Sequence, residues 1–179
     1  ILEKGCVRED RTGVGTISLF APVSMKYDLS DTFPLLTLKR GFLRAIFEEL
    51  ILYIRGQTNN NILKDKNIHI WDGNTTREFL DKRGLNHLPE GDMGETYGFN
   101  MRHYGGTYVD CKTSYGKKNG FDQLEYVIDL IKNDPHSRRI LINLWNPKTT
   151  CNAALPSCLH QYQFYVDTDK KKLNVQIYL

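Results

Sequence analysis

The sequence predicts one α+β domain over residues 1–179, because two helical apolar patterns precede paired strand-like runs and nothing marks a linker or a repeat. A chain of 179 residues is enough for one domain with a real core. The hydrophobic fraction of 40% and charged fraction of 25% are ordinary for a globular protein. A net charge of +3 is too small to indicate a nucleic-acid partner, and no apolar stretch approaches the roughly 20 residues of a membrane-spanning helix.

The N-terminal residues predict a polar loop over 8–16, punctuated by glycines, followed by a strand. Loosely alternating apolar residues over 17–25 indicate that strand, with a bulge at Pro22. Residues 32–36 then form a connector. The chain does not start with methionine and stops inside an expected strand, so we expect these residues to be part of a longer protein.

Helices are predicted next in the chain. Over 41–55 apolar residues recur at helical spacing on a wide face, and Gly56 is placed to end the helix. A short helix is expected at 60–64 and another at 75–83, ended by Gly84.

The second half of the chain predicts an irregular segment, a helix and strands. Residues 87–120 are rich in Gly, Tyr and Asn with little periodicity, which indicates a long irregular segment. Residues 121–132 place apolar side chains on one helical face, and an Asn-Asp-Pro sequence stops that helix. Strands are expected over 140–145, 159–166 and 173–179, the last two joined by a turn at 167–170.

Cys158 and the pair Arg138 and Arg139 suggest covalent chemistry on a phosphorylated substrate. A guanidinium pair recognises phosphate through bidentate hydrogen bonds. A cysteine near fixed positive charge is stabilised as the nucleophilic thiolate. The alternative is that Cys158 is a small buried hydrophobic residue, which is the commoner role of a lone cysteine. The spacing alone leaves both interpretations open.

Arg11 and the pair Glu48 and Glu49 are further candidates. Arg11 lies in a glycine-punctuated segment that could clamp an anion or be a surface turn, and the segment lacks the G-K-[ST] element of a Walker loop. Adjacent residues are about 100° apart on a helix, so at least one of the two carboxylates could face the apolar side. Desolvated there, it could exchange protons near neutral pH. The alternative is an ion pair with Arg44 or Arg55 on a solvated edge.

The aromatic residues, histidines and cysteines narrow the choice of chemistry. Trp71 and Tyr97 could stack on a flat ring, although aromatic side chains are usually core. The histidines show no metal-ligand spacing, so no metal is expected. The cysteines show neither C-x-x-C spacing nor a disulfide framework, which favours a reducing, cytoplasmic setting.

A series of short motifs runs along the chain in a fixed order. They are residues 10–16 (DRTGVGT), 33–40 (FPLLTLKR), 49–50 (EL), 55–59 (RGQTN), 70–72 (IWD), 91–99 (GDMGETYGF), 134–140 (DPHSRRI), 145–147 (WNP), 154–158 (ALPSC) and 163–166 (QFYV). Over essentially the whole chain they resemble the folate-dependent thymidylate synthase family. Asn74 and the insert over 108–119 look more like the eukaryotic and DNA-virus members.

The resemblance implies a fold and a reaction. The fold would be a mixed β-sheet with flanking helices, whose sheet packs on that of a second subunit in an obligate homodimer, consistent with strands too apolar for a solvated face. The reaction would be reductive methylation of dUMP to dTMP. Its co-substrate, 5,10-methylenetetrahydrofolate, would donate the one-carbon unit and the hydride and leave as dihydrofolate. No metal, membrane or nucleic acid would be needed.

The resemblance also implies roles for individual residues. By position in the motifs, Cys158 would be the nucleophile that adds to C6 of the pyrimidine, Glu49 the acid/base carboxylate and Tyr97 the residue that orients groups near the thiol. Arg11 would hold the phosphate, and Arg138 and Arg139 would reach the partner subunit's phosphate site. Ile70 and Trp71 would pack the folate.

The sequence departs from the family beside the nucleophile. The family has Pro-Cys-His where this chain has Ser157-Cys158-Leu159, and His160 comes one place later, so on a strand it would point to the opposite face. The family's Arg-Ser-x-Asp motif, its pyrimidine-reading asparagine and its His-x-Tyr pair would lie beyond Leu179. Two other functions therefore stay open: a dCMP or dUMP hydroxymethylase of the same fold, and a degenerate, non-catalytic scaffold.

Overall fold

The computed structural model describes residues 1–10, 13–21 and 23–179. These residues form two compact units, Ile1–Gly41 and Phe42–Leu179. Within the described ranges, no helix is both long enough and apolar enough to cross a membrane. The single domain expected over 1–179 stays a prediction.

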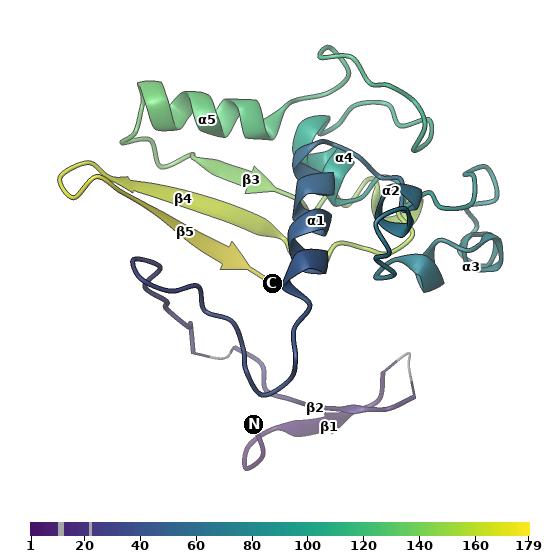
Figure 1. The fold of residues 1–179 in the computed structure, drawn as a ribbon, viewed down its shortest axis with the longest axis horizontal. Helices are drawn as coiled ribbons and strands as arrows, with labels where there is room; N and C mark the ends of the chain where they lie inside the picture. The colour runs from purple at the N-terminus through teal and green to yellow at the C-terminus, as the bar shows by residue number, and fades with distance from the viewer. Residues whose placement is uncertain (11–12, 22) are drawn as a thin grey trace. The chain divides into compact units, whose positions relative to one another are not determined.

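The first unit contains one small antiparallel sheet (Figure 1). Strand β1 (Cys6–Arg8) pairs with β2 (Thr16–Ser18), with Val7 opposite Ile17. The strand expected over 17–25 is therefore wrong beyond Ser18, while the bulge at Pro22 lies outside the described residues. Val23 and Met25 are 92% and 80% exposed, so their alternation meets no apolar surface within this unit that would hold a strand.

The second unit begins with the helices that the sequence predicts. Helix α1 (Leu43–Ile54) ends before Gly56, whose φ of 72° is the left-handed conformation that terminates helices. Helix α2 (Asn61–Lys64) and helix α3 (Arg77–Lys82) follow, and the Thr76 side chain caps α3 by accepting from the Phe79 N–H. A 3₁₀ turn, Asp72–Asn74, lies between them.

Helix α4 (Tyr97–Arg102) lies inside the segment that we expected to be irregular, so that expectation is wrong for these residues. Four consecutive α4 residues, from Gly98 to Met101, are buried. A short helix that is covered on all sides shows no alternation of apolar and polar residues, which is why periodicity does not reveal it. Apart from α4, the described residues of 87–120 form no helix or strand, as expected for an irregular segment.

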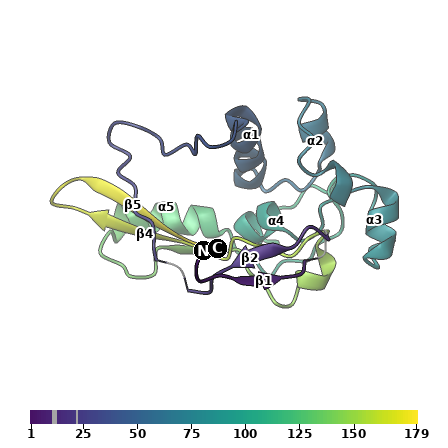
Figure 2. The same ribbon diagram turned by 90° about the horizontal axis from the view of Figure 1, so that it is seen from below.

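The second sheet follows α5 (Gln123–Asn133) and consists of β3 (Leu141–Asn143), β4 (Gln161–Asp167) and β5 (Lys172–Tyr178) in the order β3-β4-β5. Every pairing between described strands is antiparallel, so the expected mixed sheet is not found in them. The predicted turn between β4 and β5 is confirmed, and it projects away from helices α1 to α4 (Figures 1 and 2).

The two faces of this sheet differ in chemistry. Tyr162, Phe164 and Val166 of β4 pack with α5 and with the buried Ile140, Ile142 and Leu144. The register places Ile177, Val175 and Leu173 of β5 beside them on that same face. The opposite face carries mainly glutamine, asparagine and tyrosine side chains from Gln161 to Tyr178. We expected strands too apolar for a solvated face. In the structure, apolar and polar residues alternate along β4 and β5, so that the apolar side chains share the α5 face and the other face is polar.

Arg102 joins three helices at one point. Its Nε and Nη2 donate to the Asp122 carboxylate, with a shortest distance of 2.8 Å, and its Nη1 donates to the Ile54 carbonyl oxygen at 2.7 Å. Asp122 also caps α5 by accepting from the Glu125 N–H at 2.9 Å. Burial raises the pKa of the Asp122 carboxyl, but the bonds from Arg102 and Glu125 outweigh it, so the pKa lies below its usual value.

We expect Asp122→Asn to lower the free energy of unfolding by about 1–3 kcal/mol at pH 7. Asparagine keeps the cap of α5 but loses the charge that Arg102 binds. Because the folded pKa of Asp122 lies below the unfolded one, this stabilisation is present above about pH 4 and is lost as the pH falls through the folded pKa. Urea unfolding of the variant and the unmodified protein measures the difference in unfolding free energy at pH 7 and at pH 3.

The matched control is Glu125→Gln, one turn along the same helix. Glu125 pairs with Lys117 at the exposed surface, so its loss should change the unfolding free energy by less than about 0.5 kcal/mol. If the two variants lowered the unfolding free energy equally at pH 7, the bond between Arg102 and Asp122 would not be what holds these helices together.

Candidate active site

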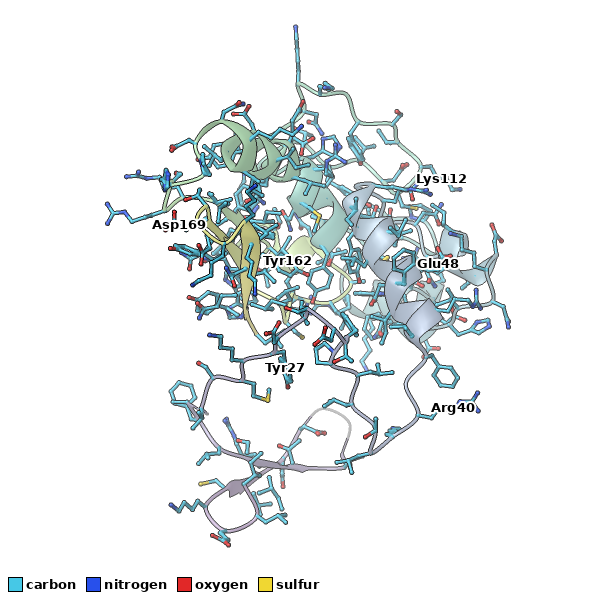
Figure 3. All side chains as sticks on the ribbon, turned by 60° about the vertical axis from the view of Figure 1, so that its left-hand side comes forward. Tyr27, Arg40, Glu48, Lys112, Tyr162 and Asp169 are labelled. Atoms are coloured by element: carbon cyan, nitrogen blue, oxygen red, sulfur yellow. The ribbon has the colours of Figure 1, made fainter. Side chains whose placement is uncertain are left out.

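Glu49 is held by hydrogen bonds on the partly buried side of α1. Its Oε1 accepts from the Tyr53 hydroxyl at 2.8 Å and from the Trp71 Nε1–H at 2.6 Å. The neighbouring Glu48, labelled in Figure 3, instead pairs with Lys66. The helix thus separates the two carboxylates as expected, with Glu49 toward the aromatic residues, but the ion-pair partner of Glu48 is neither Arg44 nor Arg55.

Tyr97 connects this cluster to the segment that carries Cys158. Its ring centroid lies 5.0 Å from that of Tyr53 and 6.4 Å from that of Trp71. Its hydroxyl oxygen accepts a hydrogen bond from the backbone N–H of Cys158 at 2.8 Å. Burial raises the pKa of Tyr97, so its phenol stays protonated near neutral pH and keeps an O–H to donate. Tyr97 therefore links the aromatic residues around Glu49 to the backbone of Cys158.

The segment that carries Cys158 is fixed by a close backbone approach at Gly94. The Ala154 N–H donates to the Met93 carbonyl oxygen at 3.0 Å, and a Cβ on Gly94 would lie 2.2 Å from the Asn152 carbonyl oxygen. Only glycine fits there, and its φ of 72° is one that other residues rarely adopt. Leu155 then packs on the core formed by Trp71 and its neighbours.

Cys158 itself is exposed and free. Its exposure excludes the alternative in which it is a buried hydrophobic residue. The two residues after Cys158, where the sequence departs from the family, point different ways. The Leu159 side chain packs into the core beneath the sheet, while the exposed His160 ring lies 5.2 Å from the Trp145 ring. The prediction that His160 points to the opposite face is confirmed.

Arg138 and Arg139 are exposed and lie far from the thiol of the same chain. They precede β3, and Ile140 bonds to Phe164 on β4, whereas Cys158 precedes the other end of β4. At about 3.3 Å per residue, the extended chain places them roughly 20 Å from Cys158, and strand side chains stand across this direction rather than along it. Direct stabilisation of the thiolate by this arginine pair within one chain is therefore wrong.

The remaining predicted site residues are placed less centrally. Ile70 is 47% exposed beside the cluster, whereas Trp71 is only 6% exposed and packs with Leu52, Leu63 and Met93. Arg11 lies outside the described residues. Among the residues that are described, no three side chains of His, Cys, Asp or Glu gather in a way that could hold a metal ion.

Sequence reasoning missed Tyr53. The side chain lies one helical turn after Glu49 and donates to it, which is the i,i+4 relation in which side chains on a helix meet. The signal was therefore in the sequence, but a tyrosine inside an apolar helical pattern is ordinarily counted as core.

Comparison with known proteins identifies the family. The thymidylate synthase family model matches residues 1–179. The chain is 50% identical over 179 residues to the thymidylate synthase of Agaricus bisporus, covering 97% of this chain and 60% of that protein. It is 53% identical over 167 residues to a probable thymidylate synthase of Schizosaccharomyces pombe, covering 93% of this chain and 27% of that protein. The chain belongs to the thymidylate synthase family.

A third relative is a bifunctional dihydrofolate reductase-thymidylate synthase from Paramecium tetraurelia, 47% identical over 170 residues. The match covers 95% of this chain and 36% of that protein. The chain thus spans between about a quarter and three fifths of the length of these relatives.

We expect Gly98→Ala to displace Tyr97 and destabilise the second unit. An alanine Cβ at position 98 would lie 2.3 Å from the Gln57 carbonyl oxygen, so α4 must move away from the segment after α1. Overpacking of this kind costs about 1–3 kcal/mol of unfolding free energy, measurable by urea unfolding. Gly73→Ala is the control, because nothing lies within 4 Å of its added Cβ. A Gly98→Ala variant as stable as the control would show that this contact is not tight.

Proposed function

We propose that the protein catalyses the reductive methylation of dUMP to dTMP with 5,10-methylenetetrahydrofolate. The observation that carries this proposal is a series of contacts from α1 to the segment before β4. Glu49 bonds to Tyr53 and Trp71, their rings pack with Tyr97, and Tyr97 bonds to the backbone of Cys158. A carboxylate held by aromatic donors, in one cluster with a tyrosine that binds the backbone of an exposed cysteine, suits nucleophilic addition to a pyrimidine with proton transfer. Membership of the thymidylate synthase family supports the same reaction.

The proposed steps assign one task to each residue. The Cys158 sulfur forms a bond to C6 of the uracil ring, and the electron pair of the C5–C6 double bond makes C5 the nucleophile. Glu49 moves protons at the pyrimidine and the folate. C5 would form its new bond to the one-carbon unit and lose its proton, and the bond from that carbon to the folate nitrogen would break. Hydride added to that carbon would then re-form the C5–C6 double bond as the C6–sulfur bond breaks and returns the thiolate. Tyr97 holds the Cys158 backbone and presents its own O–H to the substrate. Bound 5,10-methylenetetrahydrofolate would supply the one-carbon unit and the hydride, giving dihydrofolate.

The residues around Glu49 fit a flat, partly apolar co-substrate. Ile70 offers an exposed apolar side chain at the edge of the cluster, and apolar contact with a ring system is the ordinary way in which such ligands are held. Trp71 is so buried that it offers the folate little surface, and its polar atom is already bonded to Glu49. We therefore assign folate contact chiefly to Ile70 and a supporting role to Trp71.

The proposal includes a homodimer in which Arg138 and Arg139 serve the partner subunit's phosphate site. The separation of roughly 20 Å from Cys158 along β4 supports an action between chains, because a cation so far along the strand is out of place for the nucleotide bound to its own thiol. Arg11 is proposed as the phosphate ligand from the same chain. The cytoplasmic setting stays a prediction.

The first test compares Cys158→Ala with Cys151→Ala, using dUMP and 5,10-methylenetetrahydrofolate and following dihydrofolate by absorbance. We expect Cys158→Ala to lower kcat by at least about a thousandfold, because no other group replaces the covalent bond to C6. Cys151 is the matched control: it is also exposed and free, in the 3₁₀ turn Thr150–Asn152, and its loss should leave turnover unchanged.

Other outcomes of this assay would contradict the proposed reaction. Release of tetrahydrofolate in place of dihydrofolate would identify the hydroxymethylase, since water and not hydride then completes the product. Unchanged turnover in Cys158→Ala would end the covalent mechanism, and absence of turnover in the unmodified protein would favour the scaffold.

A second test mixes inactive variants and allows their subunits to exchange. Cys158→Ala combined with the double variant Arg138→Ala and Arg139→Ala should recover up to about a quarter of full activity, because half of the dimers are then mixed and each has one intact site. Cys158→Ala mixed with Glu49→Ala is the control and should recover nothing, since both groups belong to one chain. No recovery in the first mixture would contradict the shared site.

A further inference from the structure

We propose that Tyr53 is a positioning residue for Glu49, which locks one carboxylate oxygen so that the other is presented to the substrate. This inference rests on the proposed function, because it gives Glu49 the proton-transfer role. It assigns a task to a side chain that the sequence patterns did not single out.

The hydrogen bonds to Glu49 are unevenly distributed. Oε1 accepts both the Tyr53 hydroxyl at 2.8 Å and the Trp71 Nε1–H at 2.6 Å. The same Nε1–H also lies 3.2 Å from the Tyr53 oxygen, so the three polar groups form a closed triangle. Within the described part of the chain, no donor reaches Oε2. A carboxylate fixed through one oxygen has its other oxygen oriented but unoccupied, which is the arrangement that proton exchange with a ligand requires.

The Tyr53 hydroxyl is a permanent donor. Burial, and next the negative charge of Glu49, raise the pKa of Tyr53 far above its usual value, so the phenol stays protonated. A neutral hydroxyl that donates to a carboxylate favours the charged form of that carboxylate. Loss of this donor should therefore make the carboxylate bind a proton at higher pH.

Other ionisable groups lie on the elements that carry the triangle or pack near it. Burial raises the pKa of Tyr97 on α4 and of Tyr162 on β4, which is labelled in Figure 3, so both phenols are neutral near pH 7. The remaining groups are the Cys158 thiol beside Tyr97, the pair Lys66 and Glu48 at α1, and the pair His69 and Asp72 beside Trp71. None of them donates to Glu49 among the described contacts, which leaves Tyr53 as its hydroxyl donor.

The competing interpretation is that Tyr53 is only a core side chain. Its ring packs against Tyr97 at 5.0 Å with the planes tilted by 37°, and it contacts the core beneath α1. A phenylalanine ring would keep these contacts and lose only the hydroxyl. Tyr53→Phe therefore separates packing from positioning.

The kinetic experiment compares Tyr53→Phe with Tyr126→Phe in the protein at its natural length. Tyr126 on α5 is also half-buried and ring-packed, against Phe121, and its hydroxyl makes no hydrogen bond to the described residues. We expect Tyr53→Phe to lower kcat about tenfold with little change in KM for dUMP, and to move the low-pH limb of the kcat profile to higher pH. The control should show neither change.

Glu49→Gln supplies the test of coupling. If Tyr53 acts through Glu49, adding Tyr53→Phe to Glu49→Gln should cause no further loss of kcat. An equal tenfold loss in both backgrounds, or an unshifted pH profile, would overturn the positioning role.

A readout without turnover keeps this inference separate from the proposed function. The Trp71 indole N–H donates to Glu49, so its NMR chemical shift should report protonation of that carboxylate, and Trp71→Phe identifies the signal. We expect the titration midpoint of this signal to rise in Tyr53→Phe and not in Tyr126→Phe. Equal midpoints would overturn the role of Tyr53 even in an active enzyme. If the unmodified protein forms no dTMP but the midpoint still rises in Tyr53→Phe, the proposed function is overturned and the positioning of Glu49 stands.

Discussion

The structure of the larger unit depends on the way α4 is held against its neighbours. The Arg102 guanidinium at the end of α4 bonds to the Asp122 carboxylate at the start of α5 and to the last carbonyl of α1. At the other end of α4, Gly98 allows the helix to approach the Gln57 backbone. These contacts fix both ends of a six-residue helix that would have no stability alone. The hydrogen bond from the Cys158 backbone to Tyr97 then ends on a fixed point.

The site follows from that fixed point in a short series of contacts. Tyr97 stands on the first turn of α4, so holding α4 places its ring against Tyr53 and its hydroxyl under the Cys158 backbone. The same packing brings the Trp71 indole to Glu49. Buried polar groups that are paired in this way are strongly oriented, because leaving any one of them without its partner costs free energy. The geometry of Glu49 is consequently a property of the core and not of a surface loop.

The sequence predicted those parts of the fold in which one pattern decides the structure. Helices α1 and α5 and strands β4 and β5 carry a repeating apolar face, and each lies within a few residues of its expected bounds. Helix α4 has no such face because it is buried on all sides, and the strand expected after β2 has no apolar surface to pack on within its unit. Glu48 and Glu49 could not be told apart by spacing, since the choice depends on Lys66 and Trp71, which are distant in the sequence.

Leu159 stands where the family has a histidine, so the position after Cys158 carries an apolar side chain. The Leu159 side chain packs into the core, so the side chain after Cys158 contributes no polar group to the site, and His160 is turned toward Trp145. The side chain that bonds to the Cys158 backbone comes from a helix, as Tyr97 of α4, and its ring packs on Tyr53, which bonds to Glu49. The backbone at Cys158 thus depends for its orientation on a helix that is distant in the sequence. The hydroxyl groups of Tyr97 and Tyr53 therefore contribute more to orienting this site than they would where a histidine follows the cysteine. This is the physical reason for the proposed positioning role of Tyr53.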